Sequence, residues 1–197
     1  MSLDALALCN PFLGQKLEIL GPNRGPQIDA FKRAASPYLV TSAPGIPWCG
    51  AFVFWVLRQI TKLERRELSA QLGFPEPWYP ESCDSWLAGA RAQKRHDGAS
   101  ITQTPTRGDL FLWLRRKEVE GNKVVYDVND ATHIGFVLAA PTALGARFPT
   151  LEGNTCPETH GDAKASREGD GVYIRSRPWS RGGMVFISLP DHIKDGF

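Results

Sequence analysis

The stretch GIPWCGAFVFWVLRQ, Gly45 to Gln59, contains the strongest structural and chemical signals of the chain. From Trp48 to about Lys62 the residues are apolar nearly all round, which is typical of a helix buried on most sides. Cys49 stands where the preceding loop becomes this helix. A thiol attacks only as a thiolate, and a helix N-terminus lowers the pKa of a cysteine. Cys49 is therefore either a core thiol or a nucleophile, and the rest of the sequence has to distinguish the two.

Patterns on both sides of this stretch predict the neighbouring elements. Upstream, a helix runs from about Gln27 to Ser36 and ends before a proline. Downstream, Ser82 caps a third helix, CDSWLAGARAQKRH, which a turn at 97–98 closes. The strand patterns that follow are GDLFLWLRR (108–116), KVVYDV (123–128), HIGFVLAA (133–140), FPTLEGN (148–154), GVYIRSRP (171–178) and GGMVFISLP (182–190). Helices followed by neighbouring strands predict an α+β fold with a largely antiparallel sheet.

Length and composition describe one folded domain. The chain has 197 residues, of which 42% are hydrophobic and 22% charged, enough for a single sizeable core. We divide it into an N-terminal arm or short helix at 1–14 and a single domain at 15–197. The polar, Gly-rich residues 155–171 read as a loop, and GNK at 121–123 as a hairpin turn. The four cysteines are too widely spaced for a disulfide framework, so we expect thiols.

Nucleic-acid binding is excluded by the net charge of the chain, and a membrane-spanning helix is excluded by the lengths of its apolar stretches. A formal net charge of +2 is too small for nucleic-acid binding, which usually needs a concentrated basic patch. No stretch approaches the roughly 20 apolar residues of a membrane helix. The N-terminus, MSLDALALCNPFLGQ, has no basic leader before its short apolar run, so no signal peptide is expected. We therefore expect the protein to be cytoplasmic when synthesised and to reach any substrate outside the membrane by release or delivery.

Catalysis by Cys49 requires a base, and His133 is the best placed of the four histidines. It begins the strong strand pattern HIGFVL, so a sheet would hold it while its side chain projects at the strand end. A third group must orient the imidazole. The next strand ends in LEGN, where Glu152 and Asn154 are two residues apart and face the same side of a strand. A paired strand would place both beside His133, one of them accepting from the second ring nitrogen.

These residues fit one reaction scheme. His133 takes the proton of Cys49, the thiolate attacks an amide carbonyl, and a thioester forms; His133 then protonates the leaving amine and activates water. The first-turn N–H groups of the helix, which the small Gly50 leaves approachable, would form part of an oxyanion hole. Trp48 would line the groove and stack on substrate, or else belong to the core. The scheme needs no cofactor.

Cys83 is the alternative nucleophile, because it also starts a predicted helix. Asp84 beside it would raise its pKa, and no strand-borne histidine is implied for it. Two groups of possible metal ligands also occur. The possible zinc ligands are Cys156, His160 and Asp162, which lack the second spaced pair of a zinc site. The possible calcium ligands are Asp127, Asn129 and Asp130, which lack the full pattern of a calcium loop. We therefore predict no metal site.

The blocks quoted above resemble, in order, those of the CHAP family, the cysteine, histidine-dependent amidohydrolases/peptidases. They are PWCGAFVFWVLRQ, GDLFLW, HIGFVL, LEGNT and GVYIRSRP…GGMVFISLP, with GPNRGPQIDAF similar to the lead-in helix region of bacterial members. The resemblance covers about Asn23 to Leu189. The cysteine block alone is moderately specific, and the ordered set, with EGN after the histidine strand, is much more so.

The resemblance implies a papain-like α+β fold in which the nucleophile helix packs on an antiparallel sheet. It also implies hydrolysis of an amide bond in peptidoglycan. The family's nucleophile falls on Cys49, its general base on His133, its orienting acid on Glu152 and its asparagine on Asn154. Some members carry a structural calcium in an acidic loop near the cysteine, but residues 36–47 contain no carboxylate, so that site is not expected here.

Three functions remain open from the sequence. The first is a peptidoglycan amidase or endopeptidase, either a phage-type lytic enzyme or an effector with an export or immunity partner, acting in the periplasm or cell wall. The second is a thiol acyltransferase or deamidase that acts on protein through the same Cys49 and His133. The third is a wall-binding module that has lost catalysis, and the intact Cys49, His133 and Glu152 argue against it.

Overall fold

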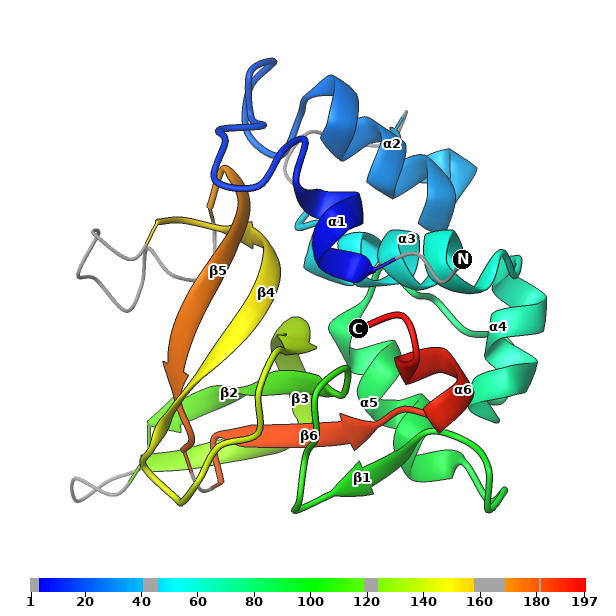
Figure 1. The fold of residues 1–197 in the computed structure, drawn as a ribbon, viewed down its shortest axis with the longest axis vertical. Coiled ribbons are helices and arrows are strands. Elements are labelled where there is room, and N and C mark those ends of the chain that lie inside the picture. Colours follow the sequence, from blue (N-terminus) through cyan, green and yellow to red (C-terminus); the bar gives the residue numbers. More distant parts are fainter. Residues whose placement is uncertain (1–3, 41–45, 119–123, 158–168, 181) are drawn as a thin grey trace.

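The computed structural model describes residues 4–40, 46–118, 124–157, 169–180 and 182–197. The helices are α1 (Ala5–Cys9), α2 (Pro26–Ala35), α3 (Cys49–Thr61), α4 (Arg65–Leu72), α5 (Cys83–Ala92) and α6 (Asp191–Lys194), with a 3-10 turn at Pro37–Val40. The strands are β1 (Ser100–Thr102), β2 (Leu110–Glu118), β3 (Val124–Val137), β4 (Arg147–Thr155), β5 (Gly171–Pro178) and β6 (Met184–Ser188). Figure 1 shows α1 to α4 gathered on one side of the molecule and β4 and β5 on the other.

The strands form one antiparallel sheet in the order β1-β6-β2-β3-β4-β5. This confirms the prediction of an α+β fold with a largely antiparallel sheet. In the register of β2 and β3, Trp113 lies opposite His133. The pairing of β3 with β4 sets Phe136 opposite Leu151. The order of the strands therefore places the predicted histidine and the LEGN segment on neighbouring strands.

Helix α3 packs against β3 and β4 and supplies much of the core. Phe52 and Phe54 are fully buried, as the all-round apolar pattern predicts. The ring of Phe52 lies over Gly153 of β4, where a Cβ would come within 2.6 Å of it. The helix ends at Lys62, which adopts a left-handed conformation with φ 60°. Gly153 thus allows α3 to sit directly on the strand that carries LEGN.

The other predicted helices are also present, with shifted ends. Helix α2 begins at Pro26, whose fixed φ suits the first helical turn. Helix α5 starts at Cys83 as predicted but ends at Ala92, before the predicted turn. Helix α4 was not predicted, and its N-terminus is a capping box in which Glu64 and Glu67 each accept from the other's backbone N–H.

The N-terminal segment is part of the packed structure. Ala5 and Cys9 of α1 are fully buried, and α1 contacts α3. The N–H of Ala5 donates to the carbonyl of Gly196 at 2.8 Å, which ties the two ends of the chain together. At least α1 of the segment expected to be an arm therefore belongs to the same core as α3.

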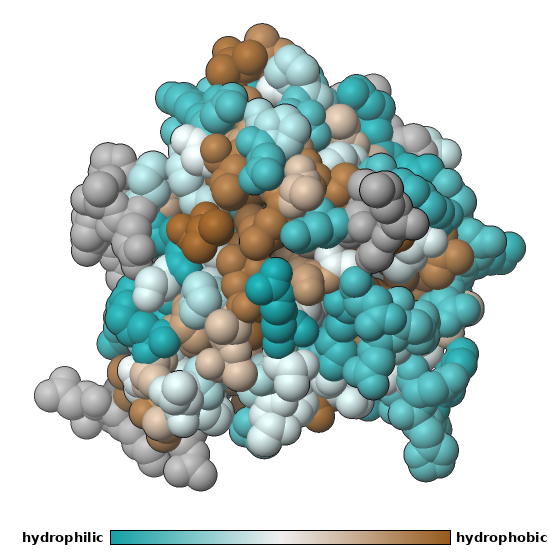
Figure 2. All heavy atoms as spheres, in the orientation of Figure 1, coloured by the Kyte–Doolittle hydropathy of each residue, from teal (hydrophilic) through white to brown (hydrophobic). Residues whose placement is uncertain are grey.

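One face of the molecule carries a band of hydrophobic side chains between two hydrophilic regions (Figure 2). Large hydrophobic residues that are exposed include Ile19 and Leu20. Among the helices of the described residues, none combines the length and the apolar character needed to cross a membrane.

Candidate active site

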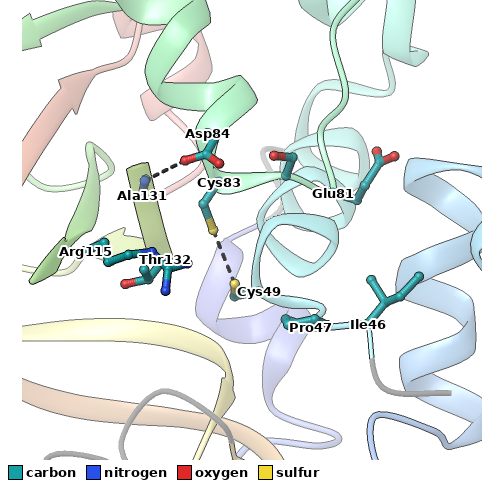
Figure 3. A pocket seen from close by; sticks show the side chains of 10 residues that line it. Ile46, Pro47, Cys49, Glu81, Cys83, Asp84, Arg115, Ala131 and Thr132 are labelled. Atoms are coloured by element: carbon teal, nitrogen blue, oxygen red, sulfur yellow. Dashed lines mark hydrogen bonds between the residues drawn. The ribbon is translucent and has the colours of Figure 1, made fainter. Parts of the chain in front are cut away.

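Cys49 is the first residue of α3 and lines a pocket of about 640 Å³ (Figure 3). The loop before α3, the start of α5, and parts of β2 and β3 form the rest of its wall. Only 3% of Cys49 is exposed, so the pocket is its route to solvent. Cys49 therefore lines a hollow large enough for part of a peptide.

The first turn of α3 presents N–H groups beside this sulfur that make no bond within the helix. Its N-cap residue, Trp48, makes no side-chain capping bond, and the first intrahelical bond runs from Phe52 N–H to Trp48 O at 2.8 Å. The N–H groups of Cys49, Gly50 and Ala51 therefore have no acceptor within the helix. Such groups can stabilise both a thiolate and a developing oxyanion.

Gly50 serves a packing role that the sequence did not suggest. A Cβ at this position would lie 2.7 Å from the carbonyl oxygens of both Pro80 and Glu81. The space beside Gly50 is thus filled by the chain that leads into α5, not left open for a substrate carbonyl. The close approach brings Cys83, the first residue of α5, to Cys49, with 3.5 Å between the two sulfurs.

Of the two roles predicted for Trp48, the structure shows the core one, and Trp48 is not among the residues that line the Cys49 pocket. Its side chain is 0% exposed and stacks on Phe31 of α2, with ring centroids 5.6 Å apart and planes at 25°. At the N-cap of α3 the indole turns toward α2, away from the pocket that Cys49 lines. Trp48 anchors the start of α3 to the core.

His133 is held in place by Glu152. Its Nε2 lies 2.8 Å from Glu152 Oε2, and both side chains are fully buried. Gly135, two residues further along β3, makes room for this contact, because a Cβ there would come within 2.9 Å of Glu152 Cγ. The glycine of the HIG sequence therefore lets the carboxylate reach the imidazole across the two strands.

Glu152 is in turn fixed by Arg177 of β5. The guanidinium is bidentate, with Nε donating to Oε1 at 2.7 Å and Nη2 to Oε2 at 2.5 Å. Thr150 donates its hydroxyl to Oε1 at 2.5 Å. The face of Trp113 lies 4.7 Å from the guanidinium carbon, a distance suited to a cation–π contact. Because Arg177, Thr150 and Glu152 are all buried, the carboxylate has little freedom to move away from His133.

The charges of the site are those of a thiolate–imidazolium pair. The pKa of Cys49 is held well below its usual 9.0, first by the hydrogen bond from Cys83, against the effect of burial, and then by His133 and the N–H of Ile134. Burial alone would lower the pKa of His133, but its interactions with Cys49 and Glu152 raise it to about 9. Burial would raise the pKa of Glu152, yet Arg177 and His133 lower it to about 2.

No hydrogen bond of standard geometry joins the Cys49 sulfur to the imidazole of His133 within the described residues. Nδ1 of His133 is buried and has no hydrogen bond of standard geometry within the described residues. The mutual pKa shifts nevertheless place Cys49 within electrostatic reach of the ring. Catalytic hydrogen bonds are commonly long or poorly aligned until substrate binds. Since Nε2 faces Glu152, Nδ1 is the nitrogen left to exchange a proton with the sulfur.

Asn154 is close to these residues in the chain but is not bonded to them. It is 1% exposed, has φ 59°, and lies at an irregularity where β4 and β5 lose register. Its side-chain oxygen and nitrogen are both without hydrogen-bond partners within the described residues. The irregularity breaks the strand alternation that would set Asn154 on the same face as Glu152. A role beside His133 stays a prediction for this residue.

The residues weighed as calcium ligands each contact a cationic side chain. The pairs are Asp127–Lys117 at 2.5 Å, Asp130–Arg115, and Asn129–Arg91 at 2.8 Å. Within the described residues, no group of three or more His, Cys, Asp or Glu side chains could hold a metal ion. Of the zinc candidates, His160 and Asp162 lie outside the described residues, as do the turn predicted at 121–123 and 158–168 of the predicted loop.

Cys49 is expected to be alkylated by iodoacetamide well below pH 8. Because its pKa is depressed, the thiolate persists as the pH falls from 9.0 and is lost only when the pH passes the lowered pKa. Cys9 is an internal control, since burial and then Asp4 raise its pKa to about 12. Peptide mapping after timed labelling from pH 5 to 10 measures each thiol separately. Labelling of Cys49 that begins only near pH 9 would contradict the ion pair.

The structure thus brings together Cys49, His133 and Glu152 of the predicted site, and adds Arg177 and Cys83. Arg177 had one available signal: in GVYIRSRP two arginines alternate on a strand next to a predicted carboxylate. Comparison of the chain with protein-family models, curated proteins and solved structures gives no match. The function is therefore inferred from the geometry of this site and from the sequence blocks around it.

Proposed function

We propose that this protein is a cysteine-dependent amidase or endopeptidase that hydrolyses an amide bond of peptidoglycan through a thioester. The observation that carries the proposal is the hydrogen-bonded series His133–Glu152–Arg177 beside Cys49, whose pKa His133 helps to lower. A thiol with a lowered pKa lies at a helix start, an imidazole with a raised pKa lies within its reach, and a buried carboxylate orients that imidazole. Nucleophile, base and orienting group are the parts that thiol acyl transfer requires.

In the acylation step, the substrate carbonyl enters the pocket with its oxygen toward the N–H of Cys49 at the start of α3. The Cys49 thiolate adds to the carbonyl carbon, and this N–H stabilises the oxyanion. His133, protonated in the resting pair, gives its Nδ1 proton to the leaving amine. The amine departs, and the acyl group remains on the sulfur as a thioester.

In the deacylation step, the neutral imidazole removes a proton from water, and the hydroxide attacks the thioester carbonyl. The acid is released, and the Cys49 thiolate and the imidazolium are restored. Glu152 keeps Nε2–H of His133 engaged throughout, so Nδ1 always faces the reacting atoms. Arg177 acts through Glu152, because its guanidinium bonds both carboxylate oxygens, including the Oε2 that faces His133.

Peptidoglycan is the substrate class favoured by the sequence blocks that resemble the CHAP family. A helix bearing the nucleophile, packed on an antiparallel sheet that bears the base, also agrees with the papain-like arrangement expected of that family. The pocket wall includes the acidic Glu81 and Asp84 and the basic Arg115. Side chains of both signs suit a stem peptide, which carries carboxylates and amines. Because peptidoglycan lies outside the cytoplasmic membrane, the protein acts there after release or delivery.

Digestion of purified peptidoglycan tests this function. The wild-type protein is expected to release soluble fragments, and Cys49→Ala is expected to release none. Mass spectrometry of the fragments, with labelling of new amino termini, identifies the bond that is cut. Cys9→Ala is the matched control, because it removes a buried thiol that does not line the pocket. Failure of the wild type on several wall types, together with deamidation or transfer on a protein substrate, would replace peptidoglycan by protein as the substrate.

A further inference from the structure

Two thiols, not one, lie at the base of the pocket. Cys49 and Cys83 are the first residues of α3 and α5, and their sulfurs face each other at 3.5 Å (Figure 3). Gly50 allows this approach, because any side chain there would collide with the backbone of residues 80–81. Both sulfurs belong to the pocket wall, so a small molecule that enters the pocket meets both.

The two thiols differ in their protonation. The pKa of Cys49 is lowered, whereas the pKa of Cys83 is raised well above 9.0, first by its hydrogen bond to Cys49 and then by burial. His133 and the N–H of Ile134 act on Cys49, which places the negative charge on that sulfur. Cys83 is the neutral S–H that donates to it. A reactive thiolate with a second thiol in contact is the usual arrangement of a reversible oxidation site.

We propose that Cys49 and Cys83 form a redox modification site, in which a hydroperoxide oxidises Cys49 and Cys83 then closes a reversible disulfide. The oxidation chemistry requires only the two cysteines. Its consequence for turnover, loss of hydrolysis while the disulfide persists, rests on the proposed function of Cys49.

The chemistry balances in two steps. In the first, the Cys49 thiolate attacks one oxygen of hydrogen peroxide, the O–O bond breaks, and sulfenic acid and hydroxide form. In the second, the Cys83 sulfur attacks the sulfenic sulfur, the S–O bond breaks, and water leaves with the proton of Cys83. The peroxide is reduced by two electrons, and the two cysteines lose them. An external dithiol returns both electrons and restores the two thiols.

The geometry suits the second step. The sulfurs must approach from 3.5 Å to a bonding distance of about 2.05 Å, a movement within the reach of side-chain rotation. The largest cause of the raised pKa of Cys83 is its contact with the Cys49 thiolate. Oxidation makes Cys49 a neutral sulfenic acid and removes that cause, so Cys83 becomes easier to deprotonate at the moment when it must attack. Each cysteine also stands at a helix N-terminus, which favours the thiolate.

The test is oxidation by hydrogen peroxide followed by intact mass measurement and peptide mapping under denaturing conditions. The wild-type protein is expected to lose the mass of two hydrogen atoms, and the map is expected to show a peptide that joins Cys49 to Cys83. Dithiothreitol is expected to reverse both changes. Cys83→Ala and Cys83→Ser are expected to gain oxygen atoms at Cys49 instead, and dithiothreitol does not remove those from sulfinic or sulfonic acid.

Cys9→Ala is the control variant and is expected to form the same cross-linked peptide as the wild type. Oxygen addition at Cys49 of the wild type without a Cys49–Cys83 peptide would overturn the proposal, whether or not the variants fold. The mass readout needs no peptidoglycan, so the two proposals can fail separately. A cross-link in a protein that digests no wall supports the redox site and removes the proposed function. Digestion of the wall by a protein that never forms the cross-link supports the proposed function and removes the redox site.

Activity gives a second readout once digestion is established. Peroxide is expected to lower the wild-type rate by at least about tenfold, and dithiothreitol to restore it, because the nucleophile is sequestered in the disulfide. For Cys83→Ser, the same treatment is expected to cause a loss that dithiothreitol does not reverse. If dithiothreitol fully restored the activity of peroxide-treated Cys83→Ser, this would contradict the proposal that the disulfide with Cys83 protects Cys49 from irreversible oxidation.

Discussion

His133→Ala is expected to lower kcat/KM for cleavage of peptidoglycan fragments by about 10⁴-fold or more, as much as Cys49→Ala does. The double variant is expected to lose no more than either single variant, because groups that act as one unit are strongly non-additive. Without the imidazole, the thiolate loses its counter-charge and the leaving amine loses its proton donor. Without the sulfur, the imidazole has no nucleophile to serve.

The measurement is the rate of new amino-terminus formation from a soluble muropeptide, for the wild type, both single variants and the double variant. His192→Ala is the matched control, since His192 lies outside the Cys49 pocket, where its Nε2 is 3.1 Å from Gln71 Oε1. It is expected to act at the wild-type rate. Losses that multiply in the double variant would show that Cys49 and His133 act independently, and near-normal activity of His133→Ala would assign the base to another residue.

Elements whose signals are local could be predicted from the sequence. The helix that begins at Cys49 and the strand that contains His133 are each marked by a run of nearby apolar residues. Turn residues between the elements mark where each one ends. The predicted antiparallel sheet follows from the succession of short strands. Helix α4 was missed because its cap is a glutamate, Glu64, which is not among the residues that usually mark a helix start.

The site residues that have local sequence signals could also be predicted. Cys49, His133 and Glu152 stand at the ends or in the motifs of predicted elements, so their residue types and order suffice to propose them. Cys83 contacts Cys49, which is 34 residues away in the sequence, and Arg177 contacts Glu152, which is 25 residues away. A local sequence pattern cannot predict contacts between residues so far apart in the chain.

The errors at the site have the same physical origin as the omissions. Nothing near Trp48 in sequence shows that its indole stacks on Phe31 in a helix that precedes it. The opening predicted beside Gly50 is filled by Pro80 and Glu81, which approach from thirty residues further along the chain. Strand alternation predicts a shared face for Glu152 and Asn154, and the loss of register between β4 and β5 removes that expectation. Each error depends on tertiary packing that overrides a local rule.

Breaking the Glu152–Arg177 pair is expected to destabilise the fold by about 3–5 kcal/mol, because each single substitution removes one member of a buried ion pair. Glu152→Gln takes the carboxylate away from the guanidinium, and Arg177→Met takes the guanidinium away from a carboxylate that still contacts His133. The double variant Glu152→Gln/Arg177→Met is expected to be more stable than the sum of the two single losses predicts, since it removes both charges together. Urea unfolding followed by tryptophan fluorescence measures each free energy. Asp97→Ala, which breaks an exposed pair with Arg95, is the control and is expected to change little.

The same pair predicts how stability depends on acid. The pKa of Glu152 is lowered from 4.5 to about 2, so its contribution to stability is complete above pH 4.5 and is lost as the pH falls toward 2. Between these values the unfolded state binds more protons at this residue, and the free energy of unfolding therefore decreases with acidification. Glu152→Gln removes the titrating group, and its free energy of unfolding should fall less steeply over that range than that of the wild type. Parallel acid profiles for the two proteins would mean that Arg177 does not hold Glu152 as a buried carboxylate, and His133 would then lack the fixed acceptor on which the proposed catalysis depends.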